Sequence, residues 1–203
     1  MPPTEEPQSS ARDRILTVAS GLFAEGGFDA VSVADIAQAS GISTGLIYYH
    51  FTDKQTLYET SVWESVHLLE EVAVHALAAE DATPADRLRQ FALDYMGLVD
   101  QHSDLVRMLV RAWDLQGPVP KLLLARSAAV IDRIQAVIDE GVAAGTLETP
   151  NPRLAAVALF ALVNTPVTAR TLEAPIDEKS ALPPAKQAEF MVDLFLKGIS
   201  PCS

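Results

Sequence analysis

The chain has 203 residues, of which 49% are apolar and 21% charged, a composition typical of a globular protein with a sizeable core. Its net charge of −12 excludes a protein that binds nucleic acid through bulk charge, because lysine and arginine supply most of the non-specific affinity for phosphate. The single cysteine, Cys202, excludes an internal disulfide framework.

The first residues predict a short disordered tail over residues 1–9, because they are acidic and Pro-rich and lack the apolar segment of a signal peptide. The longest apolar run, residues 154–163, is about half of the ~20 residues that a membrane-spanning helix needs. We therefore expect a cytoplasmic protein that has no membrane partner.

Helical periodicity runs through nearly the whole chain. Apolar residues at helical spacing predict a first helix that ends at the glycine pair of residues 26–27. Two short helices follow, over residues 33–39 and 44–51, and each is preceded by a serine that can cap it. A longer helix followed by two short ones, joined by a tight turn at Gly41, is the outline of a helix-turn-helix.

Six further helices are expected after this unit. They begin at or near residues 53, 84, 103, 121, 152 and 184, and the last three end near residues 144, 168 and 198. No alternation of apolar and polar residues predicts a strand, so the expected fold class is all-α with about nine helices. The chain divides into a small unit over residues 10–52 and a larger helical part over residues 53–200.

Four consecutive side chains with rings, residues 48–51, stand at the end of the third helix. In a helix Ile47 and Phe51 share one face, which can pack on the first helix, whereas Gly45 and Tyr49 point the opposite way. Tyrosine hydroxyls and histidine can hydrogen-bond phosphate oxygens, and small residues permit close approach to base edges. The pattern alone is compatible with DNA reading and with simple packing on the helix that follows.

Residues 15–62 resemble the TetR family of bacterial transcriptional regulators. The matching segments are LFAEGGFDAVSVADIA, residues 22–37, and GIS-x-G-x-x-Y-x-HF-x-x-K, residues 41–54. The resemblance implies a ligand-responsive repressor that binds a palindromic double-stranded DNA operator as a homodimer. Residues 10–52 would be its DNA-binding domain. Residues 53–200 would be its effector-binding and dimerisation domain, and a small, mostly apolar effector would release the DNA.

The resemblance also assigns residues to the DNA interface. Those that would face the DNA are Ser43, Thr44, Gly45, Leu46, Tyr48, Tyr49 and His50, and those that would hold phosphates from adjoining helix starts are Ser32 and Lys54. Backbone N–H groups at helix starts attract phosphate without net positive charge, so an acidic chain can still bind DNA through them. The acidic charge still disfavours DNA binding, because residues 9–58 hold only three residues that are lysine or arginine. Many relatives carry a polar or basic side chain where this chain has Leu46 or Tyr49.

The last two expected helices are unusually apolar. Residues 154–163 are apolar on every face, and a helix of that kind is buried. The pattern leaves open whether the burial occurs inside the subunit or between two copies. The resemblance favours a twofold four-helix bundle, whose interface residues would be Leu159, Phe160, Val163, Phe190, Met191, Leu194 and Phe195.

By the same resemblance, the helices between the helix-turn-helix and the last helix would enclose an effector pocket. The candidates are polar or aromatic side chains on otherwise apolar helices: Trp63, His67, Tyr95, Met96, Met108, Trp113, Asp114, Asn164 and Thr168. A place in the core or on the surface explains any one of them as well. Aromatic rings near Asp114 would suit a large, mostly apolar ligand.

An enzyme is disfavoured. The four histidines, at positions 50, 67, 75 and 102, lack metal-ligand spacing, and the chain has no H-E-x-x-H, cysteine pair, G-x-S-x-G or Gly-rich phosphate loop. We therefore expect no catalytic residues, no metal and no cofactor. Two alternatives remain, namely a helical protein-interaction module and a regulator that has no small-molecule ligand.

Overall fold

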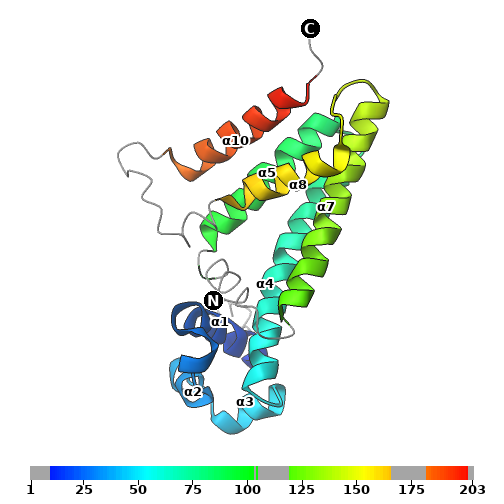
Figure 1. Ribbon diagram of the computed structural model, residues 1–203. Helices are drawn as coiled ribbons and strands as arrows, with labels where there is room; N and C mark the ends of the chain where they lie inside the picture. Colours follow the sequence, from blue (N-terminus) through cyan, green and yellow to red (C-terminus); the bar gives the residue numbers. More distant parts are fainter. Residues whose placement is uncertain (1–9, 103, 105–118, 166–181, 201–203) are drawn as a thin grey trace, which may run out of the picture.

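The computed structural model describes residues 10–102, 104, 119–165 and 182–200, and all regular structure in these ranges is α-helical, as expected. The helices are α1 (Ala11–Ala30), α2 (Val33–Ser40), α3 (Thr44–His50), α4 (Lys54–Leu77), α5 (Pro84–Gln101), α7 (Val119–Ala143), α8 (Pro152–Val163) and α10 (Pro184–Gly198). Figure 1 shows α1 to α3 gathered at one end, with α4 running from them into a larger bundle. The expected tail over residues 1–9 and the helix expected from Ser103 lie outside the described residues.

Serine side chains cap the starts of α1 and α2. The Ser10 hydroxyl accepts a hydrogen bond from the N–H of Asp13 at 3.2 Å, and the Asp13 carboxylate accepts one from the N–H of Ser10. Ser32 forms the same reciprocal pair at the start of α2. The glycine pair interrupts α1 as expected, because Gly27 has a φ of 79°, but helical turns resume beyond it and the element ends at Ala30.

A tight turn joins α2 to α3. Gly41 follows α2 with a φ of 65°, a left-handed conformation that costs glycine little, and its N–H returns to the carbonyl groups of Ala37 and Gln38. Ser43 then caps α3, because its hydroxyl accepts a hydrogen bond from the N–H of Leu46 at 3.3 Å. Together α1, α2 and α3 form the expected helix-turn-helix unit.

The 24-residue helix α4 contributes to two hydrophobic cores. The N-terminal core joins α1, α2, α3 and the first half of α4, and its buried members include Ile15, Phe23, Ile36, Ile47, Phe51 and Val62. The C-terminal core joins the second half of α4 to α5, α7, α8 and α10. Along α4 the transition from the N-terminal core to the C-terminal core falls between Val66, which belongs to the first, and Leu69, which belongs to the second. One continuous helix therefore enters both cores.

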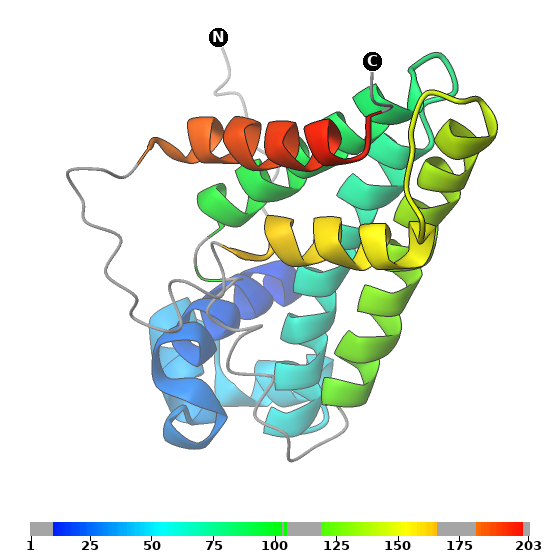
Figure 2. The same ribbon diagram turned by 45° about the horizontal axis from the view of Figure 1, so that its top comes forward.

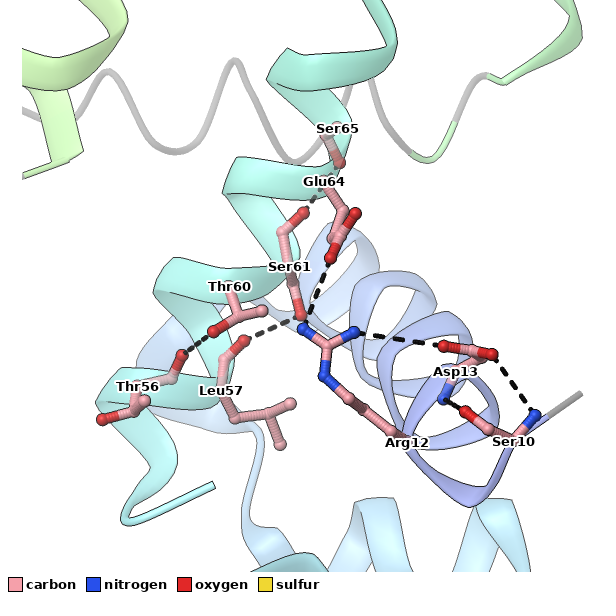
Figure 3. Close-up of polar contacts among 9 residues, drawn as sticks. All are labelled: Ser10, Arg12, Asp13, Thr56, Leu57, Thr60, Ser61, Glu64 and Ser65. Atoms are coloured by element: carbon pink, nitrogen blue, oxygen red, sulfur yellow. Dashed lines mark hydrogen bonds and ion pairs between the residues drawn. The ribbon is translucent and has the colours of Figure 1, made fainter. Parts of the chain in front are cut away.

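Polar contacts accompany the packing of α1 on α4, as Figure 3 shows. Nη2 of Arg12 lies 3.4 Å from Oε1 of Glu64. The buried hydroxyls of Ser61 and Ser65 each donate to a carbonyl group one turn earlier in α4, at 2.9 Å. Because these hydrogen bonds stay within α4, the two hydroxyls need no partner from α1.

In the larger part of the molecule α10 packs on α5 and α8, while α7 packs along α4 and α8 (Figure 2). An ion pair between Arg89 and Asp193 ties α5 to α10, and the hydrogen bond from Arg89 lowers the pKa of the Asp193 carboxyl. Helix α7 begins at Val119, two residues before the expected start, and α8 is described to Val163. None of the helices in the described ranges has both the length and the apolar composition needed to cross a membrane.

Candidate nucleic-acid interface

One face of α3 attaches the helix to the N-terminal core. Ile47 is 1% exposed, and Phe51, which directly follows the helix, is 3% exposed. The N–H of Phe51 donates to the carbonyl group of Ile47 at 2.8 Å, so the last turn closes over the same face. The guanidinium carbon of Arg12 lies 5.8 Å from the centroid of the Phe51 ring. These contacts determine which side of α3 remains outside.

The opposite face of α3 is open to solvent. Tyr49 is 81% exposed, Tyr48 52% and Leu46 39%. The ring of Tyr49 stands edge-on to that of His50, with centroids 5.2 Å apart. The other expected DNA contacts on this segment are also exposed, namely Ser43, Thr44 and Gly45. No lysine, arginine or carboxylate belongs to α3, so the helix presents a surface of rings and small groups at the end of the molecule.

Ser32, an expected phosphate contact, is already engaged with a carboxylate. Both its N–H and its hydroxyl donate to Oδ2 of Asp35, at 2.9 and 2.6 Å. These hydrogen bonds lower the pKa of the Asp35 carboxyl, which favours its negative form. A phosphate at this helix start would have to displace or share these contacts.

Lys54, the other expected phosphate contact, bonds inside the fold. Its ammonium donates to the carbonyl groups of Phe28 at 2.9 Å and Val31 at 3.1 Å, and it lies 4.2 Å from the centroid of the Phe28 ring. Two of its three N–H donors are therefore occupied. In this structure Lys54 ties the start of α4 to the last turn of α1 and to Val31, which follows it.

A second basic residue holds the other end of α2, and the sequence analysis did not assign it. Nε and Nη2 of Arg14 both donate to the carbonyl group of Ser40, at 3.1 and 2.7 Å. This carbonyl is the last of α2 and has no partner within the helix. No sequence pattern links residues 14 and 40, because their contact depends on how α1 crosses α2.

The contacts of Lys54 lead to a testable prediction. We expect Lys54→Met to lower the free energy of unfolding by about 1.5–3 kcal/mol, because two hydrogen bonds from a charged donor are lost. The salt dependence of DNA binding should not change, because no phosphate contact is removed. Urea unfolding and DNA titrations at several salt concentrations measure both quantities.

The exposed Lys186 of α10 provides the control, and Lys186→Met should change stability by less than about 0.5 kcal/mol. A Lys54→Met protein of unchanged stability whose salt slope falls by about one unit would instead make Lys54 a phosphate contact.

Two family models match the chain. Residues 15–60 match the model of bacterial regulatory proteins of the tetR family, and residues 81–168 match the model of the tetracyclin repressor-like C-terminal domain. The chain belongs to the TetR family. The first match covers α1 from residue 15, all of α2 and α3, and the start of α4.

Individual TetR-family relatives match over shorter lengths. The transcriptional repressor KstR2 of Mycolicibacterium smegmatis is 40% identical over 58 residues, which are 29% of this chain and 28% of KstR2. The regulatory protein RaaS of Mycobacterium tuberculosis is 30% identical over 140 residues, which are 68% of this chain and 60% of RaaS. In both cases the chain spans less than two thirds of the relative's length.

The TetR fold extends through both parts of the chain. The solved structure of FadR from Bacillus subtilis in complex with stearoyl-CoA superposes with a TM-score of 0.75 at 18% sequence identity. The superposition covers 92% of this chain and 98% of that one. At this identity the likeness concerns the fold alone.

The structure brings together two of the expected effector residues. The Tyr95 hydroxyl donates to Oδ1 of Asn164 at 3.0 Å, and Nδ2 of Asn164 donates to the carbonyl group of Phe160 at 2.8 Å. Tyr95 and its neighbour Met96 belong to the C-terminal core. Burial raises the pKa of Tyr95, so its phenol stays neutral. This is a polar pair set against an apolar core.

Trp63 and His67 make different contacts. The guanidinium carbon of Arg126, on α7, lies 4.5 Å from the centroid of the Trp63 ring, and Nη1 of Arg126 lies 3.1 Å from the Glu70 carboxylate. Nε2 of His67, exposed one turn after Trp63, lies 3.4 Å from the carboxylate of Glu71. The other effector candidates, Met108, Trp113, Asp114 and Thr168, lie outside the described residues. In the part of the chain that is described, no three His, Cys, Asp or Glu side chains are grouped as metal ligands.

Three of the residues expected at a twofold interface are buried within the subunit. Leu159 and Val163 of α8 are 1% exposed and Phe195 of α10 is 8% exposed, and all three belong to the C-terminal core of their own subunit. The reason is that α8 and α10 both pack on α5 and each turns one apolar face inward. Phe160 and Met191 are partly buried against the same core.

The outer faces of α8 and α10 remain apolar. The exposed fractions are 64% for Leu154 and 40% for Val157 on α8, and 60% for Phe190 and 59% for Leu194 on α10. We call these four residues the α8–α10 face. The sequence analysis missed Leu154 and Val157, because a helix that is apolar on every side gives no signal of which side faces outward.

Proposed function

We propose that the chain is a transcriptional repressor that binds a palindromic DNA operator as a homodimer and is released by a small, mostly apolar effector. The observation that carries the DNA-binding part is the exposed face of α3, which follows the tight turn after α2 and is therefore the second of the two short helices of the helix-turn-helix in a TetR-family chain. In that motif the second helix enters the major groove. KstR2 is a transcriptional repressor, which supports repression as the direction of control.

The α8–α10 face supports the homodimer. Four large apolar side chains, each at least 40% exposed, lie on the outer sides of two helices that pack together. Exposed apolar surface of this kind often marks an interface between proteins. A twofold axis through this face would place two copies of α3 on one duplex, as readers of half-sites about one helical turn apart.

The course of α4 supports control by an effector. The helix begins immediately after α3, is tied to the last turn of α1 and to Val31 by Lys54, and ends in the C-terminal core. A ligand bound among α4, α5, α7 and α8 could therefore move the helix-turn-helix by tilting α4. The FadR structure holds stearoyl-CoA, which supports a ligand with a long apolar part.

The DNA-binding part is tested by selection from random-sequence duplexes with the full-length chain. We expect enrichment of an inverted repeat, because a symmetric dimer presents two identical readers. Recovery of no common sequence after repeated rounds would contradict DNA reading and leave the protein-interaction alternative. A non-repeated sequence would contradict the dimeric arrangement alone.

The effector part requires a separate measurement. We expect stearoyl-CoA or another long-chain apolar compound to raise the melting temperature and to lower operator affinity by about 100-fold, which corresponds to about 2.7 kcal/mol. Thermal shift and quenching of the two tryptophans detect binding, and a gel shift with the selected operator detects release. A compound that binds and leaves operator affinity unchanged would contradict the proposed switch.

A further inference from the structure

The outward side of α3 lacks the side chains that read most bases through hydrogen bonds. Guanine is usually read by arginine or lysine, adenine by asparagine or glutamine, and cytosine by a carboxylate. None of these residue types occurs between Thr44 and His50. The most exposed large side chains there are those of Leu46, Tyr48 and Tyr49. The base contact that fits apolar surface is the C5-methyl group of thymine, which projects into the major groove.

Gly45 leaves open space on the exposed face of α3. A Cβ atom built on Gly45 would meet no atom within 4 Å, and the residue is not among the glycines with positive φ. Neither packing nor backbone conformation therefore requires glycine, although glycine is disfavoured in a helix relative to alanine. Gly45 and Tyr49 are four residues apart and lie on the same face. The missing side chain leaves space in which a base edge would fit beside the Tyr49 ring.

The spacing of the exposed side chains suits neighbouring base pairs. Leu46 and Tyr49 are three residues apart, which places their Cβ atoms about 5–6 Å from each other on the helix surface. Successive base pairs are separated by about 3.4 Å along the duplex. The two side chains can therefore contact methyl groups one or two base pairs apart. Such contacts need no positive charge, which agrees with an α3 without lysine or arginine.

We propose that Leu46 and Tyr49 read thymine methyl groups in each operator half-site, with Gly45 allowing the helix to come close enough. This proposal rests on the proposed function, since it concerns the chemistry of the same DNA interface. It identifies the preferred ligand as duplex DNA with thymines at two nearby positions of each half-site.

The first test uses the selected operator with deoxyuridine in place of each half-site thymidine in turn. Deoxyuridine keeps the base pair and removes only the methyl group. At one or two positions, we expect the change to weaken binding by about fourfold when made in one half-site and by about 15-fold when made in both. Exchanging that T·A pair for 5-methylcytosine·G should retain more affinity than exchanging it for C·G.

Variants of the protein then assign each methyl group to a side chain. With Leu46→Ala or Tyr49→Ala, the deoxyuridine penalty at one position should disappear, because the contact has already been lost. The proposal is wrong if no deoxyuridine changes affinity, or if the penalties persist in both variants. A selection that yields no operator contradicts the proposed function, whereas an operator insensitive to its methyl groups contradicts only this proposal.

Alanine substitutions at two separate glycines test whether DNA approaches α3 closely at Gly45. Gly45→Ala should raise the melting temperature, because alanine favours the helix and meets no neighbour, and should weaken operator binding at least tenfold through contact with the DNA. Gly21→Ala is the matched control, since a Cβ built on Gly21 of α1 also meets nothing within 4 Å. It should raise the melting temperature without changing operator affinity. Unchanged affinity in Gly45→Ala would overturn the close approach.

Discussion

Replacing Phe51 by alanine should lower the free energy of unfolding by about 3–5 kcal/mol, the usual cost of removing a buried phenylalanine ring. Phe51 is 3% exposed and belongs to the N-terminal core. It directly follows α3, on the side of the helix that faces the core. The cavity would lie directly behind α3, so the loss should loosen the helix that carries the proposed reading surface. Urea unfolding monitored by circular dichroism measures the change.

Tyr49→Ala is the control for this prediction, because the residue is two positions away and 81% exposed. Its stability should stay within about 0.5 kcal/mol of the parent, while operator affinity falls. In Phe51→Ala, by contrast, DNA binding should fall in step with the folded fraction and recover on cooling. A Phe51→Ala protein as stable as the parent would show that the ring does not belong to the core.

Replacing Leu194 by aspartate should convert a dimer into monomers. Leu194 is 59% exposed on the α8–α10 face, and twofold symmetry would bring the new carboxylate into the interface twice. An unpaired buried charge costs about 3–5 kcal/mol, so two copies should weaken the dimer by about 10⁴-fold or more. Light scattering coupled to gel filtration should then report half the parent mass, and operator affinity should fall as well.

Leu124 provides the matched control, because it is a leucine of similar exposure, 54%, on α7. Leu124→Asp should keep the mass and operator affinity of the parent. Circular dichroism of Leu194→Asp should retain the helical content, which separates dissociation from unfolding. A monomeric parent, or a variant that remains dimeric, would count against the interface.

The helix-turn-helix could be predicted from the sequence because its signals are local. Ser10, Ser32 and Ser43 each cap the helix that follows them, and Gly41 supplies the left-handed residue that ends α2. The exposure of Tyr49 followed from its position two residues from Ile47 on a 3.6-residue helix. Each of these inferences needs only a few neighbouring residues and the geometry of one element.

Contacts between distant residues could not be predicted in the same way. Lys54 was assigned to phosphate by resemblance, but its ammonium bonds to carbonyl groups 23 and 26 residues away. Arg14 reaches a carbonyl group 26 residues away. For α8, the apolar run predicted a buried helix but not which side faces the subunit's own core. Leu159 was therefore assigned to the twofold interface, and the exposed Leu154 was not identified. In each case the outcome depends on how two helices cross, which neither periodicity nor capping encodes.

Because α4 contributes to both cores, the number of residues in this helix sets the angle between the side chains that enter one core and those that enter the other. One residue inserted between Val66 and Leu69 would rotate everything beyond it by about 100°, so that one of the cores would lose its apolar side. Seven inserted residues would restore the direction to within about 20° but lengthen the helix by about 10 Å. A chimaera that exchanges the DNA-binding end for that of another family member must therefore keep the residue count along α4 unchanged.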